Sequence, residues 1–134
     1  MLHPNQFEVN EAWIAFQLND APFRTEQDGA FNCVALMDAA SCFIFDMVMV
    51  PVGKPEPSQL EVRRLLKKGW ADKRQYPKTL FVPAGRFQSV LPAEAERQGI
   101  AVVPVRESQL LVFISEAQQG FKEHFHSGGS NGEA

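Results

Sequence analysis

Two apolar runs of strand length lie only four residues apart in the chain, at residues 33–37 and 42–50. Neither run alternates cleanly between apolar and polar side chains, a pattern typical of strands that are covered on both faces. The short spacer at residues 38–41 favours an antiparallel hairpin, although it lacks the Asn-Gly or Asp-Gly pair of the commonest tight turns. The sequence therefore predicts two adjacent strands at the centre of an α/β sheet.

An amphipathic helix is predicted after this hairpin. Three prolines within residues 51–57 mark a loop, and Ser58 with Glu61 forms the capping-box pattern that opens a helix. Apolar side chains then recur at helical spacing, with the basic residues mostly off that stripe. Gly69 is expected to weaken or end the last turn. The apolar stripe consists of Val62, Leu65, Leu66 and Trp70.

Strands and helices alternate in the rest of the chain. We predict a short strand at residues 79–82, a helix over residues 86–98 that Gly99 ends in a left-handed conformation, and a buried strand at residues 100–105. Ser108 is expected to cap a last helix, whose apolar residues again recur at helical spacing. This part of the chain is typical of a parallel sheet with crossover helices.

The predicted fold class is α/β, with an N-terminal antiparallel hairpin followed by α-β-α-β-α in a three-layer sandwich. We expect a single domain over residues 31–126, because 134 residues are too few for two ordinary domains. Residues 1–30 are interpreted as an N-terminal extension with one possible strand at residues 13–18. Residues 127–134 have nothing to bury and are expected to form a flexible tail.

Two segments of the chain resemble the ribonuclease H-like superfamily, which includes the catalytic cores of integrases and transposases. Residues 34–44 are similar to the start of an integrase core, where a strand ends on an acid, here Asp38, and a small residue leads into the next strand. Residues 77–87 resemble that family's strand, Asp-Asn-Gly turn and following helix. The resemblance implies a ribonuclease H-like fold over about residues 31–125, an architecture that small bacterial domains of unknown function also keep.

The chemistry implied by this resemblance is phosphoryl transfer by two divalent metal ions, which needs at least three converging carboxylates. Asp38 stands at the position of the first acid. Pro83 and Ala84 stand where the second acid is expected, and neither side chain can bind a metal ion. We therefore predict a non-catalytic binding or interaction module with no metal and no other cofactor.

The acids also allow a second interpretation, in which the chain is a divergent metal-dependent nuclease. Asp38 and Asp46 would then carry the chemistry, with Glu107 or Glu116 as the third acid. Against this, Asp38 is more simply a turn residue that accepts backbone hydrogen bonds after a strand. Asp46 interrupts an apolar run, which favours a sheet edge or a position satisfied by a partner side chain.

Positive charge is concentrated at residues 61–78, where seven basic residues accompany two acidic ones in a chain of net charge −3. Such a stripe, beside Trp70 and Tyr76, suits a nucleic-acid-binding accessory protein that contacts phosphates and stacks on bases. A solvated helix face is the favoured interpretation, because the acidic remainder of the chain opposes binding to a polyanion. The candidate contacts with nucleic acid or another partner are Arg64, Lys67, Lys68 and Lys73.

Cysteine and histidine offer little support for a redox or metal site. Cys33 and Cys42 are interpreted as small apolar residues, because a hairpin that turns at residues 39–40 does not place them opposite each other. His3, His124 and His126 are the only histidines in the chain. The two-residue spacing of His124 and His126 directs them to different sides of a helix end, so we expect adventitious metal capture and not a native metal site.

The remaining expectations concern phosphate binding, location and partners. Gly85 lies between a strand and a helix, where a phosphate can bind free backbone N–H groups, although one glycine is far short of a Gly-rich motif. No apolar run approaches 18 residues, and the first nine residues lack the pattern of a signal peptide. We expect a bacterial, cytoplasmic protein that does not associate with membranes. Its partner is left open, and a homodimer is one possibility.

Overall fold

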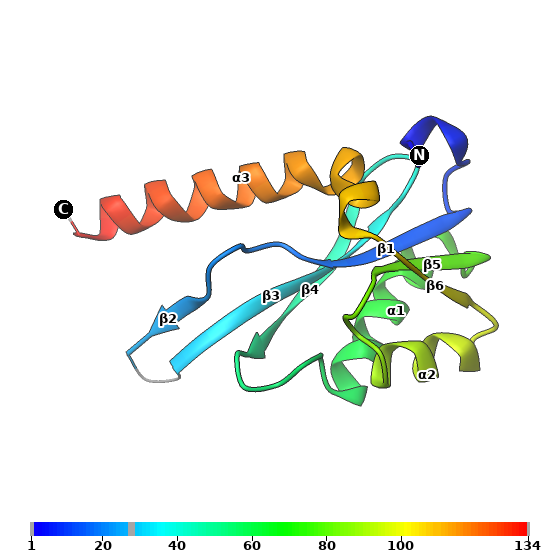
Figure 1. Cartoon of the computed structure of the whole chain (residues 1–134), viewed down its shortest axis with the longest axis horizontal. Helices are drawn as coiled ribbons and strands as arrows, with labels where there is room; N and C mark the ends of the chain where they lie inside the picture. The colour runs from blue at the N-terminus through cyan, green and yellow to red at the C-terminus, as the bar shows by residue number, and fades with distance from the viewer. Residues whose placement is uncertain (1, 27–28, 134) are drawn as a thin grey trace.

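The computed structural model describes residues 2–26 and 29–133, without the side chains of residue 25 and residues 124–133. One mixed β-sheet forms its centre, with helix α3 on one face and helices α1 and α2 on the other (Figure 1). The three-layer α/β sandwich predicted from the sequence is therefore confirmed. The strands are β1 (Ala12–Gln17), β2 (Phe23–Thr25), β3 (Gly29–Asp38), β4 (Ile44–Pro51), β5 (Thr79–Pro83) and β6 (Ala101–Val105).

The predicted hairpin is present as strands β3 and β4. They pair antiparallel, with Cys33 opposite Met49 and Ala35 opposite Met47, and the register shifts between Leu36 and Met37. Strands β5 and β6 pair in parallel and belong to the same sheet, as the alternation of strands and helices predicts. The sheet order is β2-β3-β1-β5-β6, and β4 pairs with β3 off this path.

Strand β1 has a more central place than the sequence indicates. It pairs antiparallel with β3 and parallel with β5, so it lies in the middle of the sheet. Both of its faces are covered, and Trp13, Ile14, Ala15 and Phe16 are fully buried. The possible strand predicted within residues 1–30 thus shares one sheet and one core with the predicted 31–126 domain.

Helix α1 (Gln59–Lys73) begins as predicted and ends later than predicted. The Glu61 backbone N–H donates to Ser58 Oγ at 3.2 Å, and the Ser58 N–H donates to Glu61 Oε1 at 2.9 Å, which confirms the capping box. Gly69 does not end the helix, because it is buried four residues before the end of α1, and whether it weakens the last turn stays a prediction. The helix ends at Lys73, and the cap residue Arg74 follows it with a left-handed φ of 58°.

The second half of the chain departs from the prediction at two boundaries. Helix α2 (Val90–Arg97) begins four residues later than expected, because Gly85 and Phe87 adopt positive φ values of 85° and 52° before it. Gly99 has a φ of 78°, as predicted for a left-handed stop. Residues 100–105 were expected to form a buried strand, but β6 is the edge of the sheet and residues 101–105 are largely exposed.

Helix α3 (Glu107–Glu133) begins one residue before the expected cap Ser108. It continues through most of the segment that the sequence predicts to be a flexible tail, and residue 134 lies outside the described residues. The flexibility of this segment stays a prediction. Three apolar residues near the start of α3, namely Leu110, Phe113 and Ile114, are buried against the sheet.

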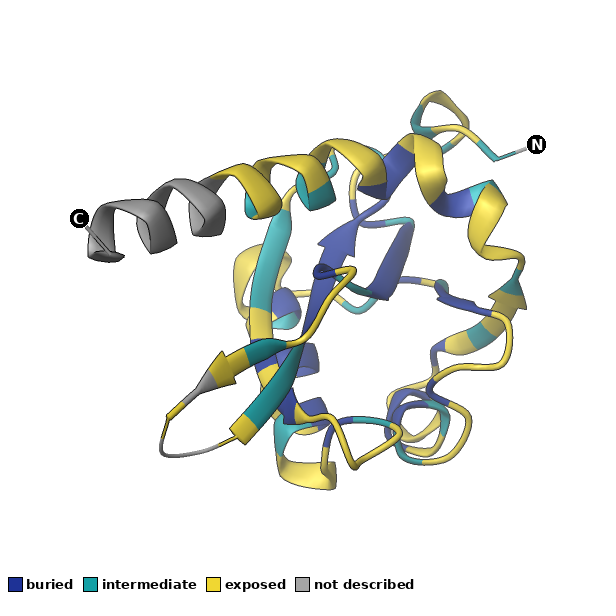
Figure 2. Cartoon of the chain, turned by 60° about the vertical axis from the view of Figure 1, so that its left-hand side comes forward, coloured by how far each residue is buried: buried dark blue, intermediate teal, exposed yellow. Residues whose placement is uncertain are grey.

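Two apolar clusters hold the layers together, one on each face of the sheet. Figure 2 shows the buried residues concentrated on the central strands and on the inner sides of the helices. Burial of apolar surface is the main favourable term in folding, so the two clusters account for the stability of the sandwich. The cluster under α1 and α2 is built around Trp13, Leu36, Leu65, Leu80 and Leu91, and the cluster under α3 around Ile14, Phe16, Met37, Leu110 and Phe113.

Candidate functional site

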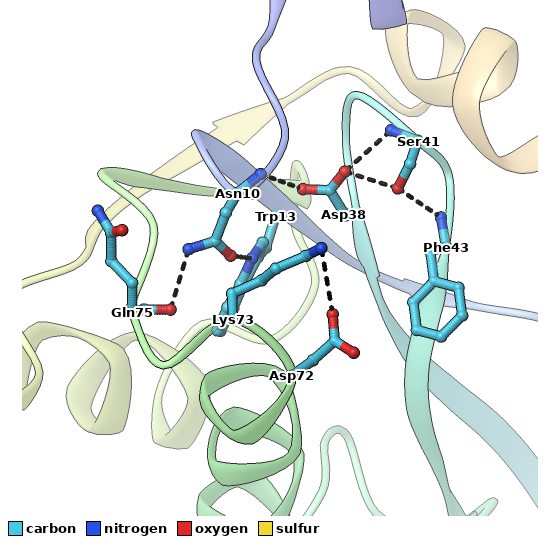
Figure 3. A network of polar contacts seen from close by, with 8 residues as sticks. All are labelled: Asn10, Trp13, Asp38, Ser41, Phe43, Asp72, Lys73 and Gln75. Atoms are coloured by element: carbon cyan, nitrogen blue, oxygen red, sulfur yellow. Dashed lines mark hydrogen bonds and ion pairs between the residues drawn. The ribbon is translucent and has the colours of Figure 1, made fainter.

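Asp38, the first candidate acid, is buried at the end of β3 with only 1% of its surface exposed. Its Oδ1 accepts a hydrogen bond from the Asn10 backbone N–H at 2.6 Å. Its Oδ2 accepts from the Ser41 N–H at 2.9 Å and from Ser41 Oγ at 2.7 Å (Figure 3). A carboxylate that accepts from the backbone just after its own strand stabilises a turn, so the turn interpretation of Asp38 is confirmed.

Asn10 connects this turn to the helical side of the sheet. Its side-chain amide donates to the Gln75 carbonyl at 3.0 Å, and its Oδ1 accepts from the Trp13 indole N–H at 2.7 Å (Figure 3). Its φ of 67° is left-handed, a conformation that asparagine tolerates better than most residues. Asn10 was not among the predicted site residues, although an asparagine two residues before the apolar run of β1 is a usable signal for such a turn.

A hollow of about 290 Å³ lies beside Asp38. Asp72 supplies the second carboxylate in its wall, and the Lys73 ammonium lies 3.7 Å from Asp72 Oδ2. The two acids are thus accompanied by a cation and by apolar side chains. The other lining residues are Val9, Ser41, Phe43 and Phe45.

Asp46, the second candidate acid, has a separate environment on β4. Its Oδ2 lies 3.5 Å from Nε of Arg64 on α1, and the same guanidinium donates to the Met47 carbonyl at 3.2 Å. Asp46 is therefore half-buried at an outer strand and satisfied by a partner side chain, as the sequence predicts. It does not line the hollow beside Asp38.

A second hollow, of about 240 Å³, lies at the carboxyl ends of β1 and β5. In α/β sheets this is the edge at which ligands commonly bind. Gln17 and Pro83 stand at these strand ends, and the Gln17 Oε1 accepts from Arg86 Nη1 at 2.8 Å. Glu107 and Asp20 are the acids of its wall. Neither Gln17 nor Arg86 carries a local sequence signal for this contact, since they are 69 positions apart in the chain.

These side chains do not fit a pair of divalent metal ions. Two-metal sites need several carboxylate ligands around a shared position. Among the side chains that the structure describes (residues 2–24, 26 and 29–123), no three His, Cys, Asp or Glu side chains gather in one place. Asp20 is largely exposed and its Oδ2 lies 3.8 Å from the Lys122 ammonium. Glu116 is exposed on α3 and joins no such cluster.

The basic face of α1 is divided between paired and unpaired cations. Arg64 and Lys73 each lie within 4 Å of an acid, Asp46 and Asp72 respectively. Lys67 and Lys68 are exposed, and neither forms an ion pair with any residue that the structure describes. Of the four candidate contacts, only Lys67 and Lys68 therefore carry a positive charge that no neighbouring acid neutralises among the described residues.

Both cysteines are free, and neither has the surroundings of an activated thiol. Burial, and then the nearby Asp46 charge, raise the pKa of Cys33 to about 11. Burial is also the first cause that raises the pKa of Cys42, followed by the charges of Asp38 and Glu116. Cys33 faces Met49 rather than Cys42 across the hairpin, as the sequence predicts.

No phosphate site was predicted from the single Gly85, and the chain itself occupies the start of α2, the helix that follows it. The Glu56 carboxylate accepts from the backbone N–H groups of Ser89, Val90 and Leu91 at 2.8–3.0 Å. A carboxylate at a helix N-terminus satisfies the same donors that a phosphate would use. His3 caps the short 3-10 helix Pro4–Gln6, and the side chains of His124 and His126 lie outside the described residues.

The strand order, with helices on both faces, defines a ribonuclease H-like fold of the integrase-core kind. The catalytic core domain of BIV integrase matches with a TM-score of 0.57 and 12% identity, over 91% of this chain and 73% of that one. A chain of the simian T-cell lymphotropic virus intasome, solved in complex with PP2A regulatory subunit B56 gamma, matches with a TM-score of 0.54 and 12% identity. That match covers 83% of this chain and 37% of the intasome chain.

At this level of identity the similarity concerns the fold alone. No protein-family model matches the sequence, and no curated protein matches it significantly. None of the helices within the described residues is both long enough and apolar enough to span a membrane.

Proposed function

We propose that this chain is a non-catalytic ribonuclease H-like interaction module of the bacterial cytoplasm. The observation that carries the proposal is the use of Asp38 inside the fold, where its two oxygens accept three hydrogen bonds. A metal ion at this carboxylate would have to compete with the Asn10 and Ser41 donors. Leaving the buried Asn10 N–H without its partner costs roughly 1–3 kcal/mol, which opposes such a rearrangement.

The ends of the parallel strands support the same proposal. Gln17 at the end of β1 is bonded to Arg86, and Pro83 at the end of β5 has no side-chain ligand atom. The hollow here holds two acids, Asp20 and Glu107, beside the Arg86 guanidinium, and two carboxylates are too few for a pair of metal ions. What remains there is a polar hollow lined by Gln17, Asn19, Arg86 and Gln118 beside these acids.

Metal-dependent cleavage is the direct test. The protein is incubated with single- and double-stranded DNA and RNA in millimolar Mg²⁺ or Mn²⁺, beside an active ribonuclease H as positive control. We expect no cleavage and no appreciable rise in melting temperature on adding either metal, since a ligand stabilises the native state in proportion to its occupancy. Cleavage that disappears in Asp38→Asn or Asp46→Asn would overturn the proposal.

A second candidate function is nucleic-acid binding by an accessory protein through α1. The exposed and unpaired Lys67 and Lys68 favour it, and Arg74, which stacks on Trp70 with its guanidinium carbon 5.2 Å from the ring centroid, adds a cation nearby. Phosphate contacts by such side chains make affinity steeply dependent on salt. The acidic remainder of the chain and the acids beside Arg64 and Lys73 weaken this candidate.

Binding measured against salt concentration tests this second candidate. Three phosphate contacts would give a log–log slope between about −2 and −3. Reversal of Lys67 and Lys68 to Glu should then abolish binding, whereas Lys54→Glu with Arg106→Glu changes the total charge equally at other exposed positions. We expect weak binding or none. Micromolar binding near physiological salt that only the first pair of substitutions removes would establish the accessory function.

A further inference from the structure

The hollow beside Asp38 lies at the other end of the sheet from the contact between Gln17 and Arg86. Asp38 is paired in register with Trp13, near the start of β1, whereas Gln17 is the last residue of that strand. The hollow is therefore separate from the carboxyl ends of the parallel strands, where ligands commonly bind in α/β sheets. The two hollows are thus independent candidates for binding.

Negative charge converges on the hollow beside Asp38 from two elements of the fold. Asp38 ends β3 and Asp72 stands in the last turn of α1, and both acids line the hollow. A helix carries a partial negative charge at its C-terminus, so an acid in the last turn is unfavourable for the helix itself. Helix stability therefore does not explain Asp72, whereas a positively charged group held in the hollow would.

Two residues in the wall of this hollow are apolar and exposed. Val9 and Phe43 are 53% and 55% exposed, and both line the hollow. The ring of Phe43 packs edge-to-face with that of Phe45, with 5.8 Å between the ring centroids. Aromatic faces attract ammonium groups, and apolar surface packs against the methylene stem of a lysine. Apolar walls beside carboxylates thus fit a side chain with an aliphatic stem and a cationic end.

Lys73, which also lines the hollow, is a side chain of this kind. Its ammonium lies 3.7 Å from Asp72 Oδ2, and Figure 3 shows the side chain reaching toward that carboxylate. Neighbouring residues in a helix do not face each other, so the lysine has to turn to reach the acid. The Lys73 and Asp72 side chains are 42% and 39% exposed, and ion pairs in solvent contribute little stability. Another ammonium group can therefore displace that of Lys73.

We propose that this hollow binds a lysine side chain of a partner protein. The incoming ammonium takes the place of the Lys73 ammonium at Asp72, and its methylenes pack against Phe43 and Val9. A protein is favoured over a free amine because exposed apolar residues grouped at a polar hollow mark protein interaction sites. A nucleic acid is disfavoured, since its phosphates would face two carboxylates. The inference rests on the proposed function of an interaction module and specifies the chemistry of its partner.

Titration of the full chain with a capped pentapeptide tests the proposal, with two-dimensional NMR of the backbone amides as the measurement. The peptide consists of glycine and alanine around one central lysine. We expect saturable shifts at residues 9, 41, 43, 72 and 73, with a dissociation constant on the order of a few millimolar, because one side chain makes few contacts. A peptide with uncharged norleucine in place of lysine should bind at least about threefold more weakly. Butylammonium, which has the charged stem without a peptide, should also bind more weakly than the lysine peptide.

Substitutions in the wall of the hollow distinguish specific binding from general attraction to an acidic protein. Asp72→Asn and Phe43→Ala should each weaken binding of the lysine peptide at least about threefold, since each removes one recognised feature. The matched controls are Glu96→Gln, which removes the same charge from an exposed position on α2, and Leu60→Ala, which shortens a 74% exposed side chain on α1. Both controls should bind the peptide like the wild type. Circular dichroism and thermal melting verify that each variant is folded.

Lys73→Ala should have the opposite effect, because it removes the ammonium that competes with the peptide. Binding of the lysine peptide should become about threefold tighter or more, since apparent affinity rises with the fraction of sites that are open. Lys54→Ala is the matched control, because it removes the same charge from an exposed loop position. This control should leave the affinity for the peptide nearly unchanged.

The absence of saturable shifts at about 20 mM peptide, several times the expected dissociation constant, would overturn the proposal. So would binding of the norleucine peptide or butylammonium as tight as that of the lysine peptide, shifts centred on other residues, or a Lys73→Ala protein that binds no more tightly than Lys54→Ala. If the peptide does not bind and nucleic acid is not cleaved, the proposed interaction module stands with a different partner. Metal-dependent cleavage that Asp38→Asn or Asp46→Asn abolishes would overturn the proposed function whether or not the peptide binds.

Discussion

Gly69 of α1 lies directly against the indole ring of Trp13 in β1. A Cβ atom on residue 69 would lie 2.6 Å from Trp13 Cη2 and 2.9 Å from Cζ2 and Cζ3, well inside van der Waals contact. The other end of the indole is held as well, because its N–H donates to Asn10. The missing side chain at residue 69 is therefore what allows the helix to approach the central strand.

Replacing Gly69 with alanine should destabilise the protein by about 1–3 kcal/mol, although alanine is the better helix former by roughly 1 kcal/mol. The matched control is Gly120→Ala in α3, where an added Cβ meets nothing within 4 Å. That substitution should be neutral or stabilise by up to about 1 kcal/mol. Urea denaturation of both variants measures the difference, and a Gly69→Ala protein as stable as the wild type would contradict the close approach.

Stability should decrease in acid partly through Glu94. Hydrogen bonds from Arg63 and Gln59, and then the charges of Arg63 and Arg97, hold the pKa of the Glu94 carboxyl below its usual value. A carboxyl whose pKa is lower in the folded state stabilises above its unfolded pKa, and this contribution is lost as pH falls through the folded pKa.

Glu94→Gln should therefore lower the free energy of unfolding near neutral pH. The difference in unfolding free energy between this variant and the wild type should become smaller below about pH 4. Denaturation curves at several pH values between neutral and acidic measure this change. Glu96→Gln, two residues away on the same helix and exposed, serves as the control. If the difference in unfolding free energy between wild type and Glu94→Gln is the same at all pH values, the ionised Glu94 carboxylate is not the cause of the loss of stability in acid.

Glu56 should matter for α2 although it lies in a Pro-rich loop far from that helix in the sequence. Its carboxylate accepts from three consecutive backbone N–H groups at the start of α2. Its removal in Glu56→Ala should cost about 0.5–2 kcal/mol, the range found for the loss of a helix cap. Glu56→Gln keeps one acceptor oxygen, so its stability should lie between that of the wild type and that of Glu56→Ala. Equal stability of all three proteins in urea denaturation would contradict this role.

Cys33 should be nearly inert to thiol reagents while the protein is folded. Its pKa of about 11 leaves very little thiolate at pH 8, and burial excludes the reagent. In a Cys42→Ala variant, labelling by an aromatic disulfide should be at least about a hundredfold slower in the native protein than in urea. In a Cys33→Ala variant, the half-buried Cys42 should be labelled faster in the native protein than Cys33 is. Rapid labelling of native Cys33 would indicate that β3 opens readily.

The candidate site was only partly predictable from the sequence. Asp38 and Asp46 were recognised as unusual because each interrupts or ends an apolar run, and their turn and edge roles follow from local rules. Asn10, Gln17 and Arg86 were missed. Asn10 meets Asp38 across 28 positions and Arg86 meets Gln17 across 69, and no periodic pattern within one segment reveals such contacts.

Local interactions explain what the sequence determined by itself. The β3–β4 hairpin and the capping box of α1 join residues within a few positions of each other, so apolar runs and spacing were sufficient to predict them. Tertiary structure alone decided that β1 lies at the centre of the sheet and β6 at its edge. It also decided that Gly69 serves close packing instead of ending a helix, because burial depends on which distant segment packs against a residue.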